Sequence, residues 1–199
     1  MLYIIGVAHR AQAKPLDACE TEAQKSFAQA LRDTIERVQP TLIAEEDCEE
    51  FLKDRGKISI AKRIAAEKAI EHRFCDPNKK ERRDIGYKDQ GTCQREVFMG
   101  DNGGLSSEEV RVRGNAIFVG RQFPVRERFW LERLGDCRDR VAIFICGEGH
   151  IKNHSFRTLL ASHGIPYKVA GHGIGLTEED AWLDEALEYL RQHPELVKK

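Results

Sequence analysis

The chain has 199 residues, 41% of them hydrophobic and 33% charged, which suffices for one domain with a continuous core and argues against general disorder. The 32 Lys and Arg residues are balanced by 33 Asp and Glu residues, so the formal net charge of -1 provides no overall positive field to attract a nucleic acid. No segment approaches the ~20 consecutive apolar residues that a membrane-spanning helix needs.

The amino terminus lacks the basic flank and the cleavage site of a secretory signal. The six cysteines are scattered, without a Cys-x-x-Cys pair that would indicate a zinc or redox site. These features predict reduced thiols in a cytoplasmic protein that does not act at a membrane. The oligomeric state is left open.

The first part of the chain predicts a strand, a helix and a second strand. Residues 2–5 are an apolar run that ends at Gly6. Over residues 21–38 apolar positions recur at steps of three and four, and Thr21 and Gln24 are spaced as a capping box. Residues 41–44 are apolar and end in acidic residues, which is typical of a buried parallel strand that reaches a polar edge.

The middle of the chain is expected to be mostly helical. A helix over 59–72 is followed by a short third strand at 73–75. Residues 76–105 are rich in charges, Gly and Asn, so we expect a loop or insertion there, either a solvated loop or a lid. Two further helices follow, from Ser106 to about residue 120 and over 124–134.

The last third of the chain contains the clearest buried strand, residues 141–146, which are continuously apolar. A helix over 151–163, a strand over 167–170 and a helix over 177–192 are expected after it. The alternation predicts a single α/β domain over 1–199, with a mainly parallel sheet of about four to five strands and helices on both faces.

Two Gly-x-x-His motifs directly follow predicted strands: Gly6-Val7-Ala8-His9 and Gly147-Glu148-Gly149-His150. Because the carboxyl ends of parallel strands line the crevice where ligands bind, we expect both histidines in one site. Glu45 ends the second strand and would join them, and other acidic residues are expected at the same edge: Glu46, Asp76 and Glu148.

Two histidines and one carboxylate suit a divalent zinc, manganese, iron or cobalt ion with open positions for water and substrate. A metal-bound water would then be the nucleophile. Without a metal, the same groups can act as base and orienting acid. Two other interpretations stay open: residues 147–149 hold a phosphate at a helix amino terminus, or polar residues simply cap solvated strand ends.

Arginines in the middle of the chain are candidates for contacting a substrate. Arg126 and Arg128 lie on the helix expected over 124–134, where one of them can pair with a carboxylate or an anionic oxygen. Arg82 and Arg83 lie in the basic stretch 79–88. The alternative for each pair is a solvated charged surface.

These residues resemble the shared pattern of the superfamily that includes TIKI and TraB proteins, erythromycin esterase and ChaN-like haem-binding proteins. The two Gly-x-x-His motifs and Glu45 match that pattern over most of residues 1–160. The resemblance implies an α/β core with a histidine and carboxylate site, a metal-dependent hydrolase in some members and a haem-binding or esterase-type site in others. It also implies an arginine, for which four residues compete: Arg82, Arg83, Arg126 and Arg128.

We therefore expect a small cytoplasmic hydrolase with a small-molecule or peptide substrate. His9, Glu45 and His150 would hold a divalent metal or act as base and orienting acid. The alternative is a non-catalytic protein that binds haem, a nucleotide or another anionic ligand. The remaining candidate residues would steer or contact the substrate: Arg126, Arg128, Arg82, Arg83 and Glu148.

Overall fold

The computed structural model describes residues 1–101, 104–135, 137–177 and 180–197. Its centre is a five-stranded parallel sheet in the order β5-β3-β6-β1-β7, which confirms the predicted α/β fold. The strands are β1 (Leu2–Val7), β3 (Leu42–Glu45), β5 (Glu71–Phe74), β6 (Ala142–Gly147) and β7 (Tyr167–Ile174).

Strand β6 lies between β1 and β3, although it comes roughly 100 residues after β3 in the chain. Ala142 pairs with Leu2 on one side and with Leu42 on the other. In the same register Val7 pairs with Gly147. The carboxyl ends of the three central strands are therefore neighbours, which is where a ligand site is expected in a parallel sheet.

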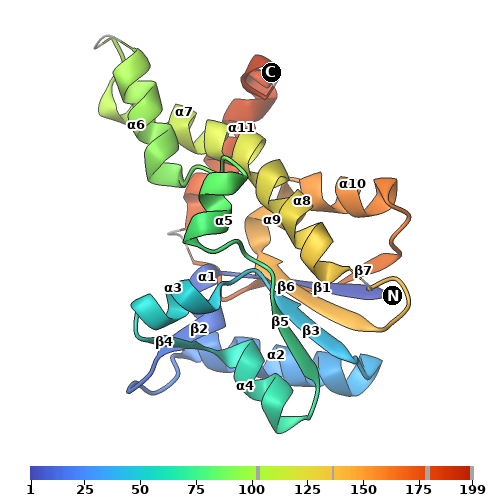
Figure 1. Cartoon of the computed structure of the whole chain (residues 1–199). Coiled ribbons are helices and arrows are strands. Elements are labelled where there is room, and N and C mark those ends of the chain that lie inside the picture. Colours follow the sequence, from blue (N-terminus) through green and yellow to red (C-terminus); the bar gives the residue numbers. More distant parts are fainter. Residues whose placement is uncertain (102–103, 136, 178–179, 198–199) are drawn as a thin grey trace.

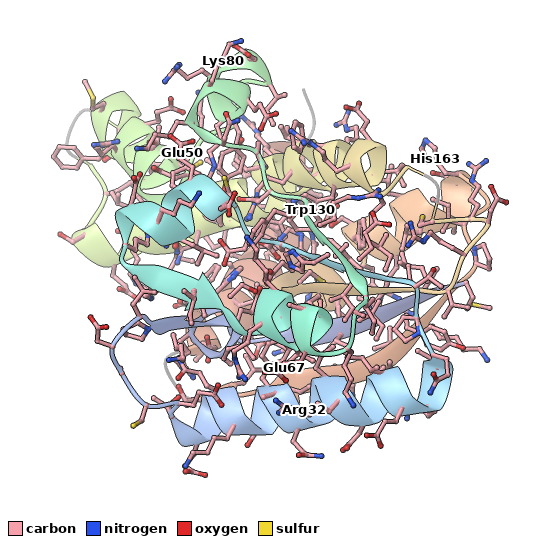
Figure 2. The ribbon with its side chains drawn as sticks, turned by 60° about the horizontal axis from the view of Figure 1, so that its bottom comes forward. Arg32, Glu50, Glu67, Lys80, Trp130 and His163 are labelled. Atoms are coloured by element: carbon pink, nitrogen blue, oxygen red, sulfur yellow. The ribbon has the colours of Figure 1, made fainter. Side chains whose placement is uncertain are left out.

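Helices cover both faces of this sheet (Figure 1). On one face lie α2 (Glu22–Val38) and α4 (Ile60–Glu67), and Figure 2 shows Arg32 of α2 near Glu67 of α4, with which it forms an ion pair. The predicted capping box of α2 is present in both directions between Thr21 and Gln24. On the other face lie α8 (Phe123–Leu134), α9 (Glu148–Lys152) and α10 (Ser155–Ser162).

A third group of helices stands over the carboxyl edge of the sheet (Figure 1). It consists of α5 (Lys79–Asp84), α6 (Gln90–Gly100), α7 (Ser107–Ile117), η1 (Phe118–Gln122) and α11 (Ala181–Gln192). The loop expected over 76–105 thus contains two helices, because Asn78 and Asp89 cap the amino termini of α5 and α6. Of the helix expected over 177–192, residues 178 and 179 lie outside the described residues.

Other elements differ from the sequence prediction in detail. The helix expected over 151–163 is interrupted between α9 and α10, where His154 has a positive φ of 61°. Four short elements were not expected, namely α1 (His9–Gln12), α3 (Glu49–Asp54) and the antiparallel pair β2 (Ala13–Pro15) and β4 (Lys57–Ser59). A 3-10 turn, η3 (Pro194–Leu196), follows α11. No helix within the described ranges is long and apolar enough to cross a membrane.

A substitution at Leu31 of α2 tests the packing on the face of the sheet that α2 and α4 cover. The Leu31 side chain is fully buried in the cluster that α2 forms with the strands. Leu31→Ala should lower the free energy of unfolding by about 2–5 kcal/mol in urea denaturation, because it leaves a cavity. Glu36→Ala, at an exposed position of the same helix, should change it by less than about 0.5 kcal/mol. Equal losses in both variants would contradict this packing.

Candidate functional site

The two Gly-x-x-His motifs lie side by side because β1 and β6 are neighbours in the sheet. His9 begins α1 and His150 lies in α9, directly after these strands. Both histidines approach the same carboxylate oxygen, Oε1 of Glu46, with Nε2 of His9 at 3.7 Å and Nε2 of His150 at 3.5 Å. The structure therefore brings the two predicted histidines to one site.

The first glycine of each motif makes room for a polar side chain of the other motif. A Cβ atom at Gly147 would lie 2.7 Å from Nε2 of His9, and a Cβ atom at Gly6 would overlap the Glu148 carboxylate. Neither distance is found between real side chains. A side chain at either glycine would force His9 or Glu148 to move, so the two motifs are sterically coupled.

Glu46 is the centre of the site, and its side chain is fully buried at the end of β3. Its Oε2 accepts a hydrogen bond of 2.6 Å from the backbone N–H of Gly147, and its Oε1 lies 2.7 Å from Nη2 of Arg126. Burial alone would raise the pKa of Glu46, but the charges of Arg126, His150 and His9 outweigh burial and hold the pKa well below its ordinary value. Glu46 is therefore a carboxylate anion at neutral pH.

Arg126 of α8 is held between two acids. Its Nε and Nη2 donate to Oδ1 of Asp76 at 2.9 and 2.7 Å, and the Trp130 indole N–H donates to the same oxygen at 3.1 Å. Arg82 pairs with the other oxygen of Asp76 at 2.6 Å. Burial would lower the pKa of Arg126, but Asp76 and Glu46 raise it, so this buried guanidinium keeps its charge.

His150 is fixed by stacking and by a second acid. Its ring stacks on Phe123 with centroids 3.8 Å apart and meets the edge of Trp130 at 4.4 Å. Its Nδ1 lies 2.6 Å from Oε1 of Glu127, while its buried Nε2 has no hydrogen-bond partner among the described residues. Burial lowers the pKa of His150, but Glu46 and Glu127 outweigh burial and raise it, which favours the protonated ring.

A cavity of about 180 Å³ opens onto these groups. His9, Arg126, His150 and Glu148 contribute polar atoms to its wall, whereas Glu46 lies behind them. Apolar side chains from the helices above the sheet enclose the rest of the cavity, among them Phe118, Phe123, Trp182 and Leu183. The volume is below the ~300–1,000 Å³ of sites for drug-sized ligands, so a small molecule or the end of a larger one fits best.

The structure places Glu45, the carboxylate expected beside the histidines, away from them. Its side chain lies on the α2 and α4 face, where Oε1 accepts hydrogen bonds from Ser59 Oγ at 2.5 Å and from His72 Nε2 at 2.7 Å. Successive residues of a strand point to opposite faces, so Glu46 reaches the histidines and Glu45 does not. The acid that faces both histidines is therefore Glu46, and the expectation that Glu45 joins them is wrong.

The other candidate residues are divided between the cavity and the surface. Glu148 lies in the cavity wall, where its Oε2 accepts the Gly173 N–H at 2.8 Å. Arg82 reaches the site through Asp76 but does not line the cavity. The structure does not bring Arg83 or Arg128 to the site, since both are exposed and Arg128 donates to the backbone of its own helix.

The donor set does not fit a resident metal ion. No group of three or more His, Cys, Asp or Glu side chains within the described ranges is arranged to hold one. Both oxygens of Glu46 already face positive partners, the Arg126 guanidinium and the Gly147 N–H. A divalent ion at Glu46 would lie against this guanidinium and be repelled by it.

Glu127 and Phe123 were missed as site residues. In the sequence Glu127 stands between two arginines, which is typical of a solvated surface. A signal was nevertheless present, because Phe123, Glu127, Trp130 and Leu134 recur at steps of four, three and four and so share one buried face of α8. A glutamate on such a face requires a partner, and His150 supplies it.

Asp47, next to Glu46, links the site to the pH dependence of stability. Burial, followed by the charge of Glu45, raises the pKa of Asp47 to about 7. This folded-state pKa lies above the ~3.9 of Asp in an unfolded chain. The contribution of protonated Asp47 to the free energy of unfolding is therefore complete below pH 4 and is lost as the pH rises to 7.

Asp47→Asn cannot deprotonate, so it avoids the loss of stability with rising pH while keeping a side-chain oxygen to accept the Cys48 N–H. Its stability gain over the wild type should be near zero at pH 4, grow up to pH 7 and then stay constant, at no more than about 4 kcal/mol. Urea denaturation between pH 4 and pH 8.5 measures it. Parallel stability curves for the two proteins would refute the elevated pKa.

Comparisons with protein-family models, with curated proteins and with solved structures find no match for this chain. The resemblance to the TIKI, TraB and ChaN-like superfamily therefore stays a prediction based on short motifs. The geometry around Glu46 is the basis for the function proposed below.

Proposed function

We propose that the protein is a hydrolase that attacks a carbonyl carbon with water as the nucleophile. One observation carries the proposal: His9, His150 and Arg126, from three separate elements, line one cavity and converge on a single oxygen of the buried Glu46 carboxylate behind its wall. Groups placed in this way can accept a proton from water and can stabilise charge that develops on an attacked oxygen.

His9 is the proposed general base. Its side chain is 64% exposed, which leaves the ring accessible to water, whereas the Glu46 side chain beside it is fully buried. With Nε2 directed toward Glu46, Nδ1 is the nitrogen that accepts the proton. The Glu46 anion then stabilises the imidazolium that forms and keeps the ring oriented.

Arg126 and the protonated His150 are the proposed stabilisers of the oxyanion. Both line the cavity. Asp76 and Glu46 keep Arg126 charged, and Glu46 and Glu127 raise the pKa of His150, which favours its protonated ring. Their positions are held before substrate arrives, Arg126 by Asp76 and His150 by Glu127 and the Phe123 ring. Charge fixed in this way lowers the barrier without reorganisation during the reaction.

The proposed substrate is a small molecule, or the end of a peptide, with an apolar group beside the reacting carbonyl. This agrees with the cavity volume and its apolar walls. The resemblance to hydrolases of the TIKI and TraB type supports the same reaction class. No disulfide joins the cysteines within the described residues, which supports the cytoplasm as the proposed compartment.

Two adjacent glutamates provide the test. Hydrolysis is measured with p-nitrophenyl acetate, p-nitrophenyl butyrate and the corresponding anilides. His9→Ala and Glu46→Gln should each lower kcat/KM at least ~100-fold, because they remove the base or the anion that orients it. Glu45→Gln, equally buried but on the opposite face, should keep kcat/KM within about threefold of the wild type.

Comparable losses in Glu46→Gln and Glu45→Gln would contradict the assignment of the site. If the wild type hydrolyses none of these substrates, the alternative of a non-catalytic binding protein gains support. Haem, nucleotides and small carboxylates are then screened for a ligand that raises the melting temperature without being consumed.

A further inference from the structure

A second cavity, of about 530 Å³, lies close to the proposed active site. Its apolar lining comes from Pro124, Leu187, Leu190 and Val197, and its polar lining comes from residues 152–155 between α9 and α10. The volume falls within the ~300–1,000 Å³ of small-molecule sites, and an apolar wall with a few polar groups is their usual composition. Nothing in the proposed reaction uses this cavity.

The two cavities are lined by the same three elements. From the η1–α8 segment, Phe123 lines the first cavity and Pro124 the second, and from α9, His150 lines the first and Lys152 the second. From α11, Leu183 and Leu187 are one turn apart. An occupant of the second cavity would therefore contact the elements that form the proposed active site.

The charged lining of the second cavity is basic. Lys152, His154 and Arg191 line it, and none of its described lining residues is acidic. Lys152 and Arg191 form ion pairs with Asp184 and Glu188, whose side chains are 64% and 51% exposed and outside the lining. Exposed pairs of this kind are weak, so both cations remain able to attract an anion. The apolar wall then favours an anion with a hydrocarbon chain.

A hydrogen-bonded path connects this cavity to His150. The Ser155 hydroxyl, at the cavity wall, donates to Oε1 of Glu127 at 2.6 Å. The same oxygen is 2.6 Å from Nδ1 of His150. A serine hydroxyl has a single hydrogen to donate, so it can serve Glu127 or a bound anion but not both.

We propose that the second cavity binds an organic carboxylate with an apolar chain and that this ligand regulates the neighbouring site by taking the Ser155 hydroxyl from Glu127. The regulatory part rests on the proposed function; the binding part does not. On binding, Glu127 loses one donor and interacts more strongly with His150, while Lys152 and Arg191 stabilise the carboxylate.

Binding is tested by calorimetry with octanoate as the probe and with octan-1-ol and octylamine as neutral and cationic controls of the same chain length. Octanoate should bind saturably and both controls at least about tenfold more weakly. Leu187→Trp, which fills the cavity, should raise the Kd at least about tenfold, and Arg191→Ala about threefold or more. Lys25→Ala, which breaks a comparable exposed pair on α2, should leave the Kd unchanged.

Equal affinity for octanoate and octylamine, or an unchanged Kd in Leu187→Trp, would overturn the proposed site. Because this measurement needs no turnover, it stands even if the protein hydrolyses nothing. Conversely, hydrolysis without octanoate binding would leave the proposed function intact and refute this inference alone.

The connection to His150 is tested by nuclear magnetic resonance on the two tryptophan indole N–H signals. Trp130 contacts the His150 ring and does not line the second cavity, so its signal reports on His150 and not on direct contact with the ligand. Octanoate should shift this signal in the wild type and in Ser162→Ala, a control on the same helix. In Ser155→Ala octanoate should still bind but the shift should be absent; an unchanged shift would overturn the regulatory path.

Discussion

The buried carboxylate of Glu46 is the constraint on which the rest of the site depends. One of its oxygens accepts the Gly147 N–H at the end of β6, and the other pairs with Arg126 of α8. The anion therefore joins the carboxyl ends of two strands to the helix above them. A buried charge of this kind is tolerated only with full pairing, so each partner must be in place for the edge of the sheet to be stable.

Pairing continues outward from Glu46 in two directions. Arg126 requires Asp76, which in turn binds the Trp130 indole and Arg82. His150 requires Glu127 on its other side. Acidic and basic groups alternate along each path, so positive charge faces the cavity while its compensating acids lie behind. The cavity wall thus combines Arg126 and His150 with two acidic residues, Glu148 and Asp180.

Much of the architecture was readable from local patterns. Apolar runs predicted β1, β3 and β6, and helical periodicity predicted most of the long helices, because burial on a sheet imposes those periods directly. The helix expected over 59–72 ends at Glu67, and the strand expected at 73–75 lies at Glu71–Phe74, where the residues are largely polar. The 76–105 segment, expected as a loop or insertion, contains α5 and α6, because both helices have an N-terminal cap and α6 packs on α7 without strong apolar periodicity. The break at His154 is a single left-handed residue, which residue type alone does not indicate.

By itself, the sequence determined that two histidines follow two strands and that acidic residues end a third, and in a parallel sheet these must share one edge. Only the tertiary structure decided between Glu45 and Glu46. Strand β3 is buried on both faces, so its composition does not tell which face a given residue joins. Likewise, only the tertiary structure decided that Arg126 and not Arg128 reaches the site. Helix α8 packs with one side on the sheet, and Trp130 and Leu134 in the core set its rotation about its own axis.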